Sequence, residues 1–438
     1  MQSKDSAPVD LAVVGGGIGG LAAAASAAQR GLSVVLFEKA STLGGRAATH
    51  SSNGFRFNVG PHALSRKGEA QKVLRALGVP FTGNRPSPSG AYAVARGQKH
   101  TLPGGFVSLL STGLLGLPGK LETAGLLGGI GRIDANTIQN TSVREWLGKH
   151  IRNADVRGLV QALFRVATYA NDPERQSAGA ALRQLQLALS SGVDYLDGGW
   201  QVLVDGLRTV AERAGVRIVA GARVTAVEHD GVVRSVRLAS GERCPATTVI
   251  LAGAPGDAAA LVDGDQARVL RTWADAAIPV RAACLDIGLS KLPRPRATFA
   301  LGIDQPLYLS VHSAVAQLAP DGGATIHVAK YLSPEDSADA KADERTLETL
   351  LDLVHPGWRD VVVERRFLPR MTVTHALSTA AAGGNPGRPG PEVPGIRNLY
   401  VVGDWVGPEG ALVDASLASA QRAADLVVRS AAGRALAA

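Results

Sequence analysis

The sequence predicts an α/β protein in which a Rossmann-like domain is interleaved with a second domain of helices and mixed sheet. Three observations predict this fold class. Residues 9–38 show the strand, glycine-rich turn, helix and second strand of a βαβ unit. The chain has 438 residues, which is more than one hydrophobic core usually serves. The pattern of helices and strands also changes near residues 81, 192 and 392, where we expect the chain to cross between domains.

The first element is a dinucleotide-binding fingerprint between Val9 and Glu38. An apolar strand enters the turn GGGIGG, an alanine-rich helix follows, and a second strand ends at Glu38. Gly15 allows the tight turn, Gly17 lets a pyrophosphate approach the backbone, and Gly20 lets the helix lie close to the strand. The helix N-terminus attracts phosphate. A carboxylate at the tip of the second strand is placed to bind a ribose diol. The complete unit therefore predicts a bound dinucleotide.

Loops and then helices follow the βαβ unit. Residues 82–120 are rich in Gly, Pro and Ser, which is typical of a chain that leaves one domain for another. A helical block is expected from about 121 to 191. Candidate N-cap residues mark the starts of its helices at Ser142, Asp155 and Ser177.

Strands dominate the remaining half of the chain. After a glycine turn and an amphipathic helix within 195–215, short strands are expected at 216–220, 222–229, 232–239 and 247–252. A mixed region adds strands near 280–288, 297–303, 307–312, 324–331 and 361–368, with one helix at 341–354. The chain closes with the strand NLYVVGD and a helix from about Gly410 to Ser430.

Charge and cysteine usage exclude several classes of function. The formal net charge is +8, but Lys and Arg are scattered and no nucleic-acid motif occurs, so we expect no nucleic-acid partner. Attraction of an anionic substrate or a membrane surface stays open. Cys244 and Cys284 lie far apart in apolar surroundings, which indicates buried thiols and a cytoplasmic location. The histidines lack metal-ligand spacing, so no metal site is expected.

Two apolar stretches need an explanation. Residues 11–28 are explained by the buried strand and helix of the βαβ unit. The segment 106–120 is broken by Gly113, Gly116 and Pro118, and it is too short to span a bilayer. We expect it either to line an apolar pocket or to touch a membrane surface, so peripheral membrane contact stays open.

Further motifs recur together with the fingerprint. They are LGGR at 43–46, GGWQVLVDGL at 198–207, RVTAVEHDG at 223–231, TVILAGAP at 248–255 and YVVGDWVGPEGALVDASLASAQRAA at 400–424. With them the chain resembles the FAD-dependent superfamily of phytoene desaturases, protoporphyrinogen oxidases and flavin amine oxidases. The resemblance implies an FAD-binding domain formed by residues 1–80, 192–256 and 392–438. Its segments alternate with a substrate domain that is largely helical over 81–191 and a mixed sheet over 257–391.

The resemblance also implies roles for individual residues. Gly15, Gly17 and Gly20 would bind the FAD pyrophosphate and Glu38 the adenosine ribose. Gly45 and Arg46 would lie against the phosphate and ribityl portion, Val224 beside the adenine, and Asp404 near the ribityl chain or pyrophosphate. Gly410, Ala411 and Leu412 would open the last helix, which points toward the flavin pyrimidine ring. His62 and Trp405 are candidate catalytic residues, with structural packing as the alternative for both.

These features predict an FAD-dependent oxidoreductase. The flavin would be held non-covalently and would accept hydride at N5 from a C–H bond of a largely apolar small molecule. Oxygen or another acceptor would then reoxidise it. The strand IPVRAACLDIG lacks the lysine of many flavin amine oxidases, and aromatic residues make up only 4% of the chain. Both departures favour a desaturase, dehydrogenase or oxidase over an amine oxidase.

Three alternatives stay open. A flavin amine oxidase is the first, and a redox-neutral flavin isomerase is the second. A non-enzymatic binding protein similar to GDP dissociation inhibitors is the third, because such proteins resemble this fold without using flavin. The presence of Glu38, Arg46 and Asp404 together favours an enzyme that holds its cofactor.

Overall fold

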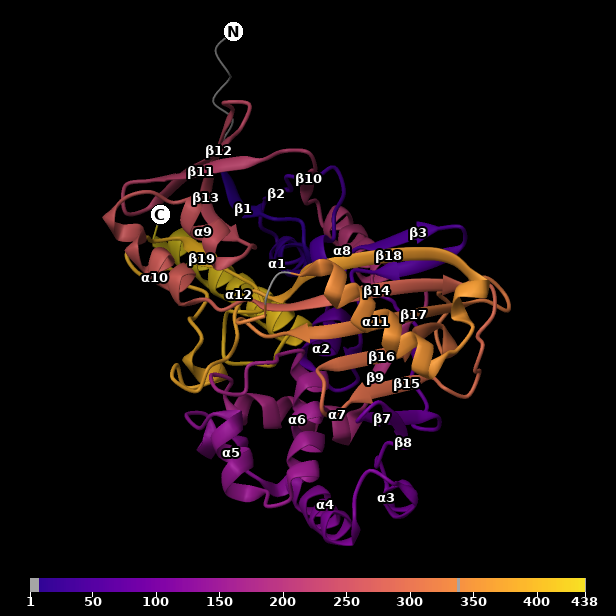
Figure 1. Cartoon of the computed structure of the whole chain (residues 1–438). Coiled ribbons are helices and arrows are strands. Elements are labelled where there is room, and N and C mark those ends of the chain that lie inside the picture. The colour runs from indigo at the N-terminus through magenta and orange to yellow at the C-terminus, as the bar shows by residue number, and fades with distance from the viewer. Residues whose placement is uncertain (1–7, 337–338, 438) are drawn as a thin grey trace.

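The structure, a computed structural model, describes residues 8–336 and 339–437 and is built around two large sheets (Figure 1). The first sheet has seven strands in the order β10-β2-β1-β13-β12-β11, with β19 also paired to β13. Strands β10, β2, β1, β13 and β19 are parallel, while β12 and β11 continue antiparallel from β13. Their bounds are β1 Val9–Val14, β2 Val34–Phe37, β10 Arg217–Val219, β11 Val224–His229, β12 Val233–Leu238, β13 Arg243–Leu251 and β19 Leu399–Val401.

Helices pack on both faces of this sheet, as a Rossmann-like fold requires. One apolar core joins it to α1 (Ile18–Ala28), α2 (Glu69–Ala76), α8 (Gln201–Arg213) and α12 (Val413–Ala437). A second core lies against α9 (Pro255–Ala260) and α10 (Arg268–Ala276). Helix α1 is nearly all alanine and glycine, so its neighbours α8 and α12 approach it closely. This arrangement confirms the predicted α/β class.

The second sheet also has seven strands, in the order β18-β14-β17-β16-β15-β7-β8. Only the pairing of β15 with β7 is parallel. Helix α11 (Ala340–Val354) packs its leucines against this sheet. The strand bounds are β7 Ala91–Ala95, β8 Gln98–Thr101, β14 Val280–Leu289, β15 Phe299–Gly302, β16 Leu307–Val311, β17 Ala324–Leu332 and β18 Val362–Thr374.

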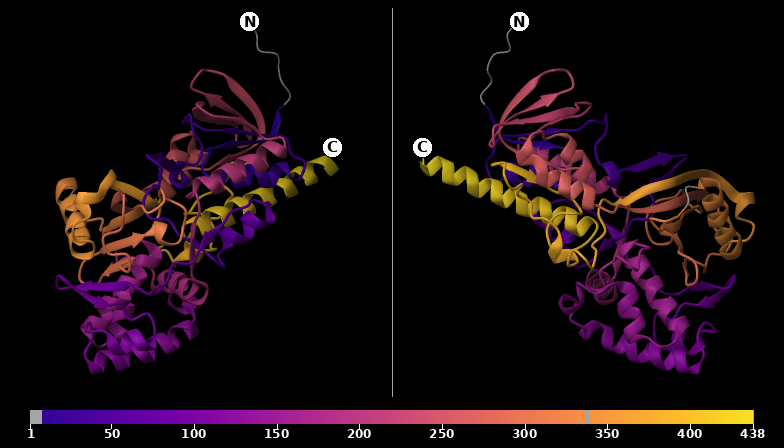
Figure 2. Two further views of the ribbon diagram at one scale, coloured as in Figure 1. Left: turned by 90° about the vertical axis from the view of Figure 1, so that its right-hand side faces the viewer. Right: turned by 60° about the vertical axis from the view of Figure 1, so that its left-hand side comes forward.

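A helical block lies at the end of the molecule opposite the N-terminal strand (Figures 1 and 2). Its helices are α3 Phe106–Ser111, α4 Leu117–Gly129, α5 Val143–His150, α6 Ala154–Thr168 and α7 Ala178–Ser191. Ser142 caps α5 and Ser177 caps α7, as predicted. The predicted cap at Asp155 is wrong, because the Asn153 side chain accepts the free N–H groups of α6 and Asp155 lies in its first turn. Small sheets β3–β4 (Thr49–Ser52, Phe55–Asn58) and β5–β9–β6 (Leu64–Ser65, Val193–Leu196, Gly83–Asn84) join the parts.

The two large sheets draw on different parts of the chain. Every strand of the first sheet lies within 1–80, 192–256 or 392–438, and every strand of the second lies within 81–191 or 257–391. The division into two interleaved domains itself stays a prediction. Among the described residues, no helix is both long and apolar enough to cross a bilayer.

Candidate active site

A chamber of about 1800 Å³ joins the first sheet to the helical block. At one end it is lined by the glycine turn after β1, and at the other by Phe106 and Val107 of α3 and Leu189 of α7. Residues from both large sheets line it, among them Val224 of β11 and Met371 of β18. The chamber is therefore shared by the two halves of the fold.

The three fingerprint glycines lie at the first end and differ in what surrounds them. Gly15 has a φ of +116°, and a Cβ there would lie 2.5 Å from the carbonyl oxygen of Ala252. A Cβ at Gly20 would lie 2.0 Å from the carbonyl oxygen of Gly15. A Cβ at Gly17 would meet nothing within 4 Å, so this position faces open space at the start of α1. The backbone thus leaves room for a phosphate where the helix dipole is positive.

Glu38 also lines the chamber, and its carboxylate organises the glycine turn. One carboxylate oxygen accepts from the Gly16 N–H at 2.6 Å, and the other accepts from the Ala40 N–H at 2.8 Å. Each carboxylate oxygen has a second lone pair. The side chain can therefore hold the turn and still accept hydrogen bonds from a diol.

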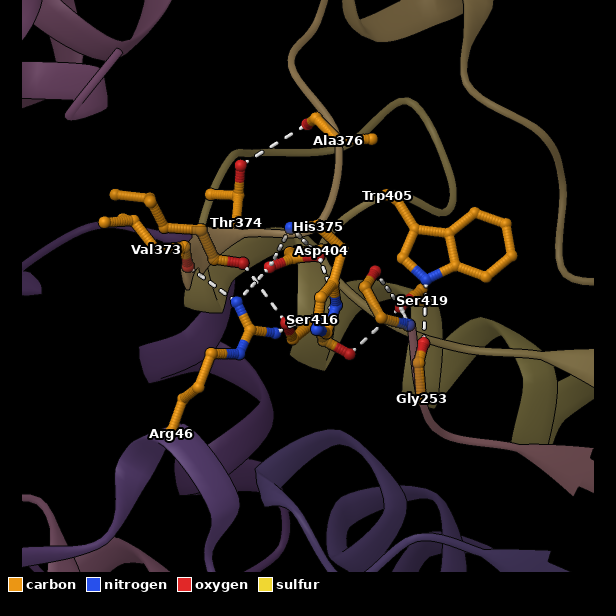
Figure 3. Close-up of polar contacts among 12 residues, drawn as sticks. Arg46, Gly253, Val373, Thr374, His375, Ala376, Asp404, Trp405, Ser416 and Ser419 are labelled. Atoms are coloured by element: carbon orange, nitrogen blue, oxygen red, sulfur yellow. Dashed lines mark hydrogen bonds and ion pairs between the residues drawn. The ribbon is translucent and has the colours of Figure 1, made fainter. Parts of the chain in front are cut away.

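Arg46 and Asp404 meet at the centre of the site, as Figure 3 shows. Arg46 follows the positive-φ residues Gly44 and Gly45, and one guanidinium nitrogen donates to Asp404 Oδ2 at 2.5 Å and to the carbonyl oxygen of Val373 at 2.6 Å. His375 adds its backbone N–H to the Asp404 carboxylate at 3.3 Å. Both Arg46 and Asp404 line the chamber.

The charge of Asp404 is fixed by this cluster. The carboxylate is almost fully buried, and burial alone would raise its pKa. The positive charge of Arg46 and the hydrogen bonds from His375 and Arg46 outweigh burial and hold the pKa of Asp404 well below its ordinary value. Asp404 therefore stays ionised and keeps Arg46 aimed at the chamber.

The start of the last helix differs from the prediction. Gly410, Ala411 and Leu412 do not open α12 as helical residues; they form the turn before it, with φ of +63° at Gly410 and +57° at Leu412. Ala411 and Leu412 still line the chamber, as does Val413, the first residue of α12. The N–H groups of Asp414 and Ala415 bond to the carbonyl oxygen of Ala411, so those of Leu412 and Val413 are left for a ligand at this end of the helix among the described residues. Arg388 fixes the turn by donating to the carbonyl oxygen of Gly410 at 2.8 Å.

His62 lines the chamber beside Trp200. The two rings lie 4.6 Å apart in an edge contact, and His62 Nδ1 lies 3.0 Å from the carbonyl oxygen of Gly60. Burial lowers the pKa of His62 to about 4, although the Gly60 hydrogen bond acts against this. His62 is therefore neutral near pH 7, with the proton on Nδ1 and Nε2 left as an acceptor. The indole N–H of Trp200 is buried without a hydrogen-bond partner among the described residues.

Trp405 lies away from the chamber. Its indole N–H donates to the carbonyl oxygen of Gly253 at 2.9 Å (Figure 3). Its ring packs edge-on against Trp273. The side chain is 2% exposed within the core behind the first sheet. Trp405 does not line the chamber, so its contacts favour structural packing over a catalytic role.

The far half of the chamber has an aromatic wall that the sequence did not reveal. Although aromatic residues are scarce overall, Tyr169, Tyr195, Tyr308, Phe299 and Trp200 all line this space. The tyrosines are buried, which raises their pKa values and keeps the phenols protonated. The scarcity of aromatic residues in the sequence therefore does not count against an amine substrate, because composition says nothing about where the few rings gather.

A cluster of buried polar side chains contacts this aromatic wall through Tyr195. Tyr195 stacks on His312 at 3.8 Å, and His312 contacts His327, whose Nδ1 lies 2.6 Å from Asp286 Oδ1. Arg366 completes the group by pairing with Asp286 at 2.5 Å. These residues, together with His375 and Met371, were missed from the sequence. Asp286, His327, Arg366 and Met371 lie on β14, β17 and β18, while His312 and His375 directly follow β16 and β18. No local motif marks them, so only the pairing of these strands brings them together.

Comparisons with known proteins agree with this geometry. The family described as flavin containing amine oxidoreductase matches residues 18–279, which is more than half of the chain. The chain belongs to this family. It is therefore a flavin-dependent oxidoreductase that acts on a small molecule, as predicted.

Relatives with closer sequence similarity match only a short segment. The chain is 52% identical over 58 residues to a carotenoid 3,4-desaturase of Haloarcula japonica, which is 13% of this chain and 12% of that protein. It is 46% identical over 55 residues to a 4,4'-diaponeurosporene oxygenase of Staphylococcus aureus, which is 13% of this chain and 11% of that protein. The similar stretch thus covers about an eighth of these relatives.

Solved structures are similar over nearly the whole chain. An oxidoreductase from Methanosarcina mazei has a TM-score of 0.75 at 19% identity, covering 94% of this chain and 98% of that one. A putative protoporphyrinogen oxidase from Exiguobacterium has a TM-score of 0.69 at 20% identity, covering 98% and 100%. Putrescine oxidase bound to putrescine has a TM-score of 0.70 at 17% identity, covering 96% and 99%. At these identities the similarity establishes the fold.

Proposed function

We propose that the chain holds FAD non-covalently and removes hydride from a C–H bond of a largely apolar small molecule. The observation that carries this proposal is the single chamber, which begins at the fingerprint glycines and ends at an apolar and aromatic wall. A short similarity to a carotenoid desaturase supports the same substrate class.

The residues at the glycine end fit a dinucleotide. Gly17 faces open space at a helix N-terminus, where a pyrophosphate would lie. Arg46 carries a planar fork of donors at the edge of that space, which suits phosphate and hydroxyl oxygens. Glu38 and Val224 would contact the adenosine, and the turn Gly410–Leu412 would face the flavin ring system. Neither Cys244 nor Cys284 lines the chamber among its described wall residues, which supports a non-covalent complex.

The chemistry follows from this placement. Bound FAD supplies the hydride acceptor at N5 and is reoxidised by oxygen or another acceptor. The N-terminus of α12 favours negative charge on the ring system facing it. The walls hold an apolar substrate by excluding water. His62, neutral and with Nε2 unprotonated, adds a hydrogen-bond acceptor to the chamber wall.

A flavin amine oxidase is the second candidate, favoured by the aromatic wall. Aromatic faces attract a desolvated cation by about 2 kcal/mol. Against it, none of the described wall residues in the substrate half (residues 59–111, 166–200, 292–315 and 371) is Asp, Glu or Lys. An ammonium group there would have no carboxylate partner. We therefore place the apolar substrate first.

The purified protein tests the cofactor. We expect a yellow protein with a flavin absorption spectrum, and we expect acid precipitation to release FAD into the supernatant. A colourless protein that takes up no FAD on reconstitution would favour the binding-protein alternative. A yellow pellet after acid treatment would contradict non-covalent binding. Reduced flavin that turns over substrate without net redox change would favour an isomerase.

A further inference from the structure

Helices α3 and α4 expose apolar side chains at the end of the molecule farthest from the N-terminal strand (Figures 1 and 2). Phe106, Val107 and Leu110 on α3 and Leu117 and Leu121 on α4 have exposed fractions between 58% and 77%. In the described part of the chain, only Leu189 and Val363 are comparable. We call these five side chains, with the helix surface between them, the α3–α4 face. Clustered exposure of this kind marks an interaction site.

Helix α4 has its polarity reversed relative to a surface helix in water. Its outward positions are Leu117, Leu121 and small residues one and two turns further along, without a charged group. Its polar side chains turn inward instead. Lys120 Nζ donates to the carbonyl oxygen of Leu110 at 2.6 Å, and Thr123 is buried. A helix that exposes its apolar side and buries its polar side is adapted to an apolar environment.

The charges around this face are mainly positive, although the exposed Asp134 follows Arg132 and Asp155 lies 3.9 Å from Arg96. Over residues 85–133 five basic side chains stand against one acidic side chain. The basic residues are Arg85, Arg96, Lys99, Lys120 and Arg132. The acidic residue, Glu122, is held by the backbone N–H groups of Arg152 and Asn153 at 2.7 and 3.0 Å. An apolar face with a basic surround matches an anionic membrane surface.

The face is also continuous with the chamber. Phe106 and Val107 belong to both the α3–α4 face and the chamber wall, and the exposed Leu189 of α7 also lines the chamber. The apolar surface outside and the chamber wall inside therefore share side chains of α3, with Ser108 and Ser111 of the same helix also on the wall.

From these observations we infer that the α3–α4 face docks on the surface of a lipid bilayer that carries anionic headgroups. The five apolar side chains enter the interfacial layer while the exposed Lys99 and Arg132 remain at the level of the phosphates. A second copy of the chain fits poorly, because a symmetric pair would bring the two basic surrounds together. That an apolar substrate passes from the bilayer into the chamber rests on the proposed function; the docking itself does not require flavin.

Vesicle flotation tests the docking. The full-length protein is mixed with vesicles of phosphatidylcholine alone or with phosphatidylglycerol added, at low and high salt. We expect flotation with the anionic vesicles and loss of part of it at high salt, because salt screens the basic residues. The triple variant Leu110→Gln, Leu117→Gln, Leu121→Gln changes three leucines that do not line the chamber. Glutamine favours helix about as well as leucine does, so the two helices should be kept. We expect its binding to fall by roughly tenfold or more, since three apolar side chains no longer enter the bilayer.

Val363→Gln is the matched control, because it removes an exposed apolar side chain from β18 elsewhere on the surface. It should float like the unchanged protein, and both variants should retain the same flavin content. Equal flotation of the triple variant, or absence of flotation for the unchanged protein, would overturn the inference. A dimer in solution that the triple variant dissociates would assign the face to a second copy. Loss of flavin from the unchanged protein would instead count against the proposed function alone.

Discussion

Arg46 is the residue on which cofactor retention should depend most. It lies on the chamber wall, and its partner Asp404 is 358 positions away in the chain. Arg46→Ala removes charge-assisted hydrogen bonds worth about 1.5–3 kcal/mol. We expect FAD to dissociate roughly 10- to 150-fold more readily, as measured by flavin fluorescence on dilution.

The matched control is Arg46→Lys, which keeps the positive charge but not the planar fork. Its FAD dissociation should lie between that of the unchanged protein and that of Arg46→Ala. Removing Arg46 also leaves the Asp404 carboxylate buried without its cation, which lowers stability. The thermal unfolding of each apoprotein should therefore be measured as well. Full flavin content in a folded Arg46→Ala protein would contradict the assignment.

Glu38 should decide which dinucleotide is bound. Its carboxylate would repel a 2′-phosphate, so NADP should not be the tightly held cofactor. Glu38→Ala should weaken FAD binding by roughly 1–3 kcal/mol, because a charged acceptor is lost. Glu38→Gln keeps an acceptor for the Gly16 N–H and should weaken FAD binding less than Glu38→Ala does. Isolation of the protein with NADP and no flavin would overturn this prediction.

At the scale of elements, the first turn of α12 contains a carboxyl group that is costly to ionise. Asp414 is buried and accepts from the Ala70 N–H at 2.8 Å, and burial raises its pKa to about 6. The folded state therefore binds this proton more tightly than the unfolded state does. Its contribution to stability is complete below about pH 4 and is lost as the pH rises through 6.

Asp414→Asn replaces the protonated carboxyl by a neutral amide that keeps the acceptor for Ala70. We expect the variant to gain up to about 3 kcal/mol over the unchanged protein above pH 7, since the difference between the two pKa values sets the gain. The gain should shrink between pH 6 and 4.5 in urea unfolding. A difference that is constant over this range would show that titration of Asp414 is not its cause.

The same helix shows how far the sequence could predict elements and the site. The strand positions predicted from apolar runs agree closely with the structure, because a fully buried strand leaves a continuous apolar run in the sequence. The predicted start of α12 is wrong because Leu412 takes a positive φ, a conformation that a leucine does not indicate in the sequence. The contact of Arg46 with Asp404 required both motifs to be recognised first. The wall formed by Tyr169, Tyr195 and Tyr308 had no local signal at all, since tertiary packing alone gathers it.

For the molecule as a whole, the two sheets and the helical block meet at one chamber, and its shape should select the substrate. Apolar contact contributes about 25 cal/mol for each Å² buried, so a long hydrocarbon needs no charged partner to bind. We expect bulky apolar compounds with a C–H bond next to unsaturation to bleach the flavin without oxygen, and simple primary amines not to. Fast anaerobic reduction by a polyamine would instead place the amine oxidase first.

A single substitution in α7 tests whether that chamber is the substrate site. Gln184, Leu185, Ala188 and Leu189 form one face of α7 on the chamber wall, whereas Leu187 lies off it. Ala188→Phe would place a ring in the chamber and should slow flavin reduction by long apolar substrates by about tenfold or more, because overpacking costs about 1–3 kcal/mol. Leu187→Phe is the matched control and should reduce at the original rate. Flavin content should be equal in both, because α7 lies away from the glycine turn. If both variants are reduced at the same rate by such a substrate, the chamber wall at α7 is not its route or its binding site.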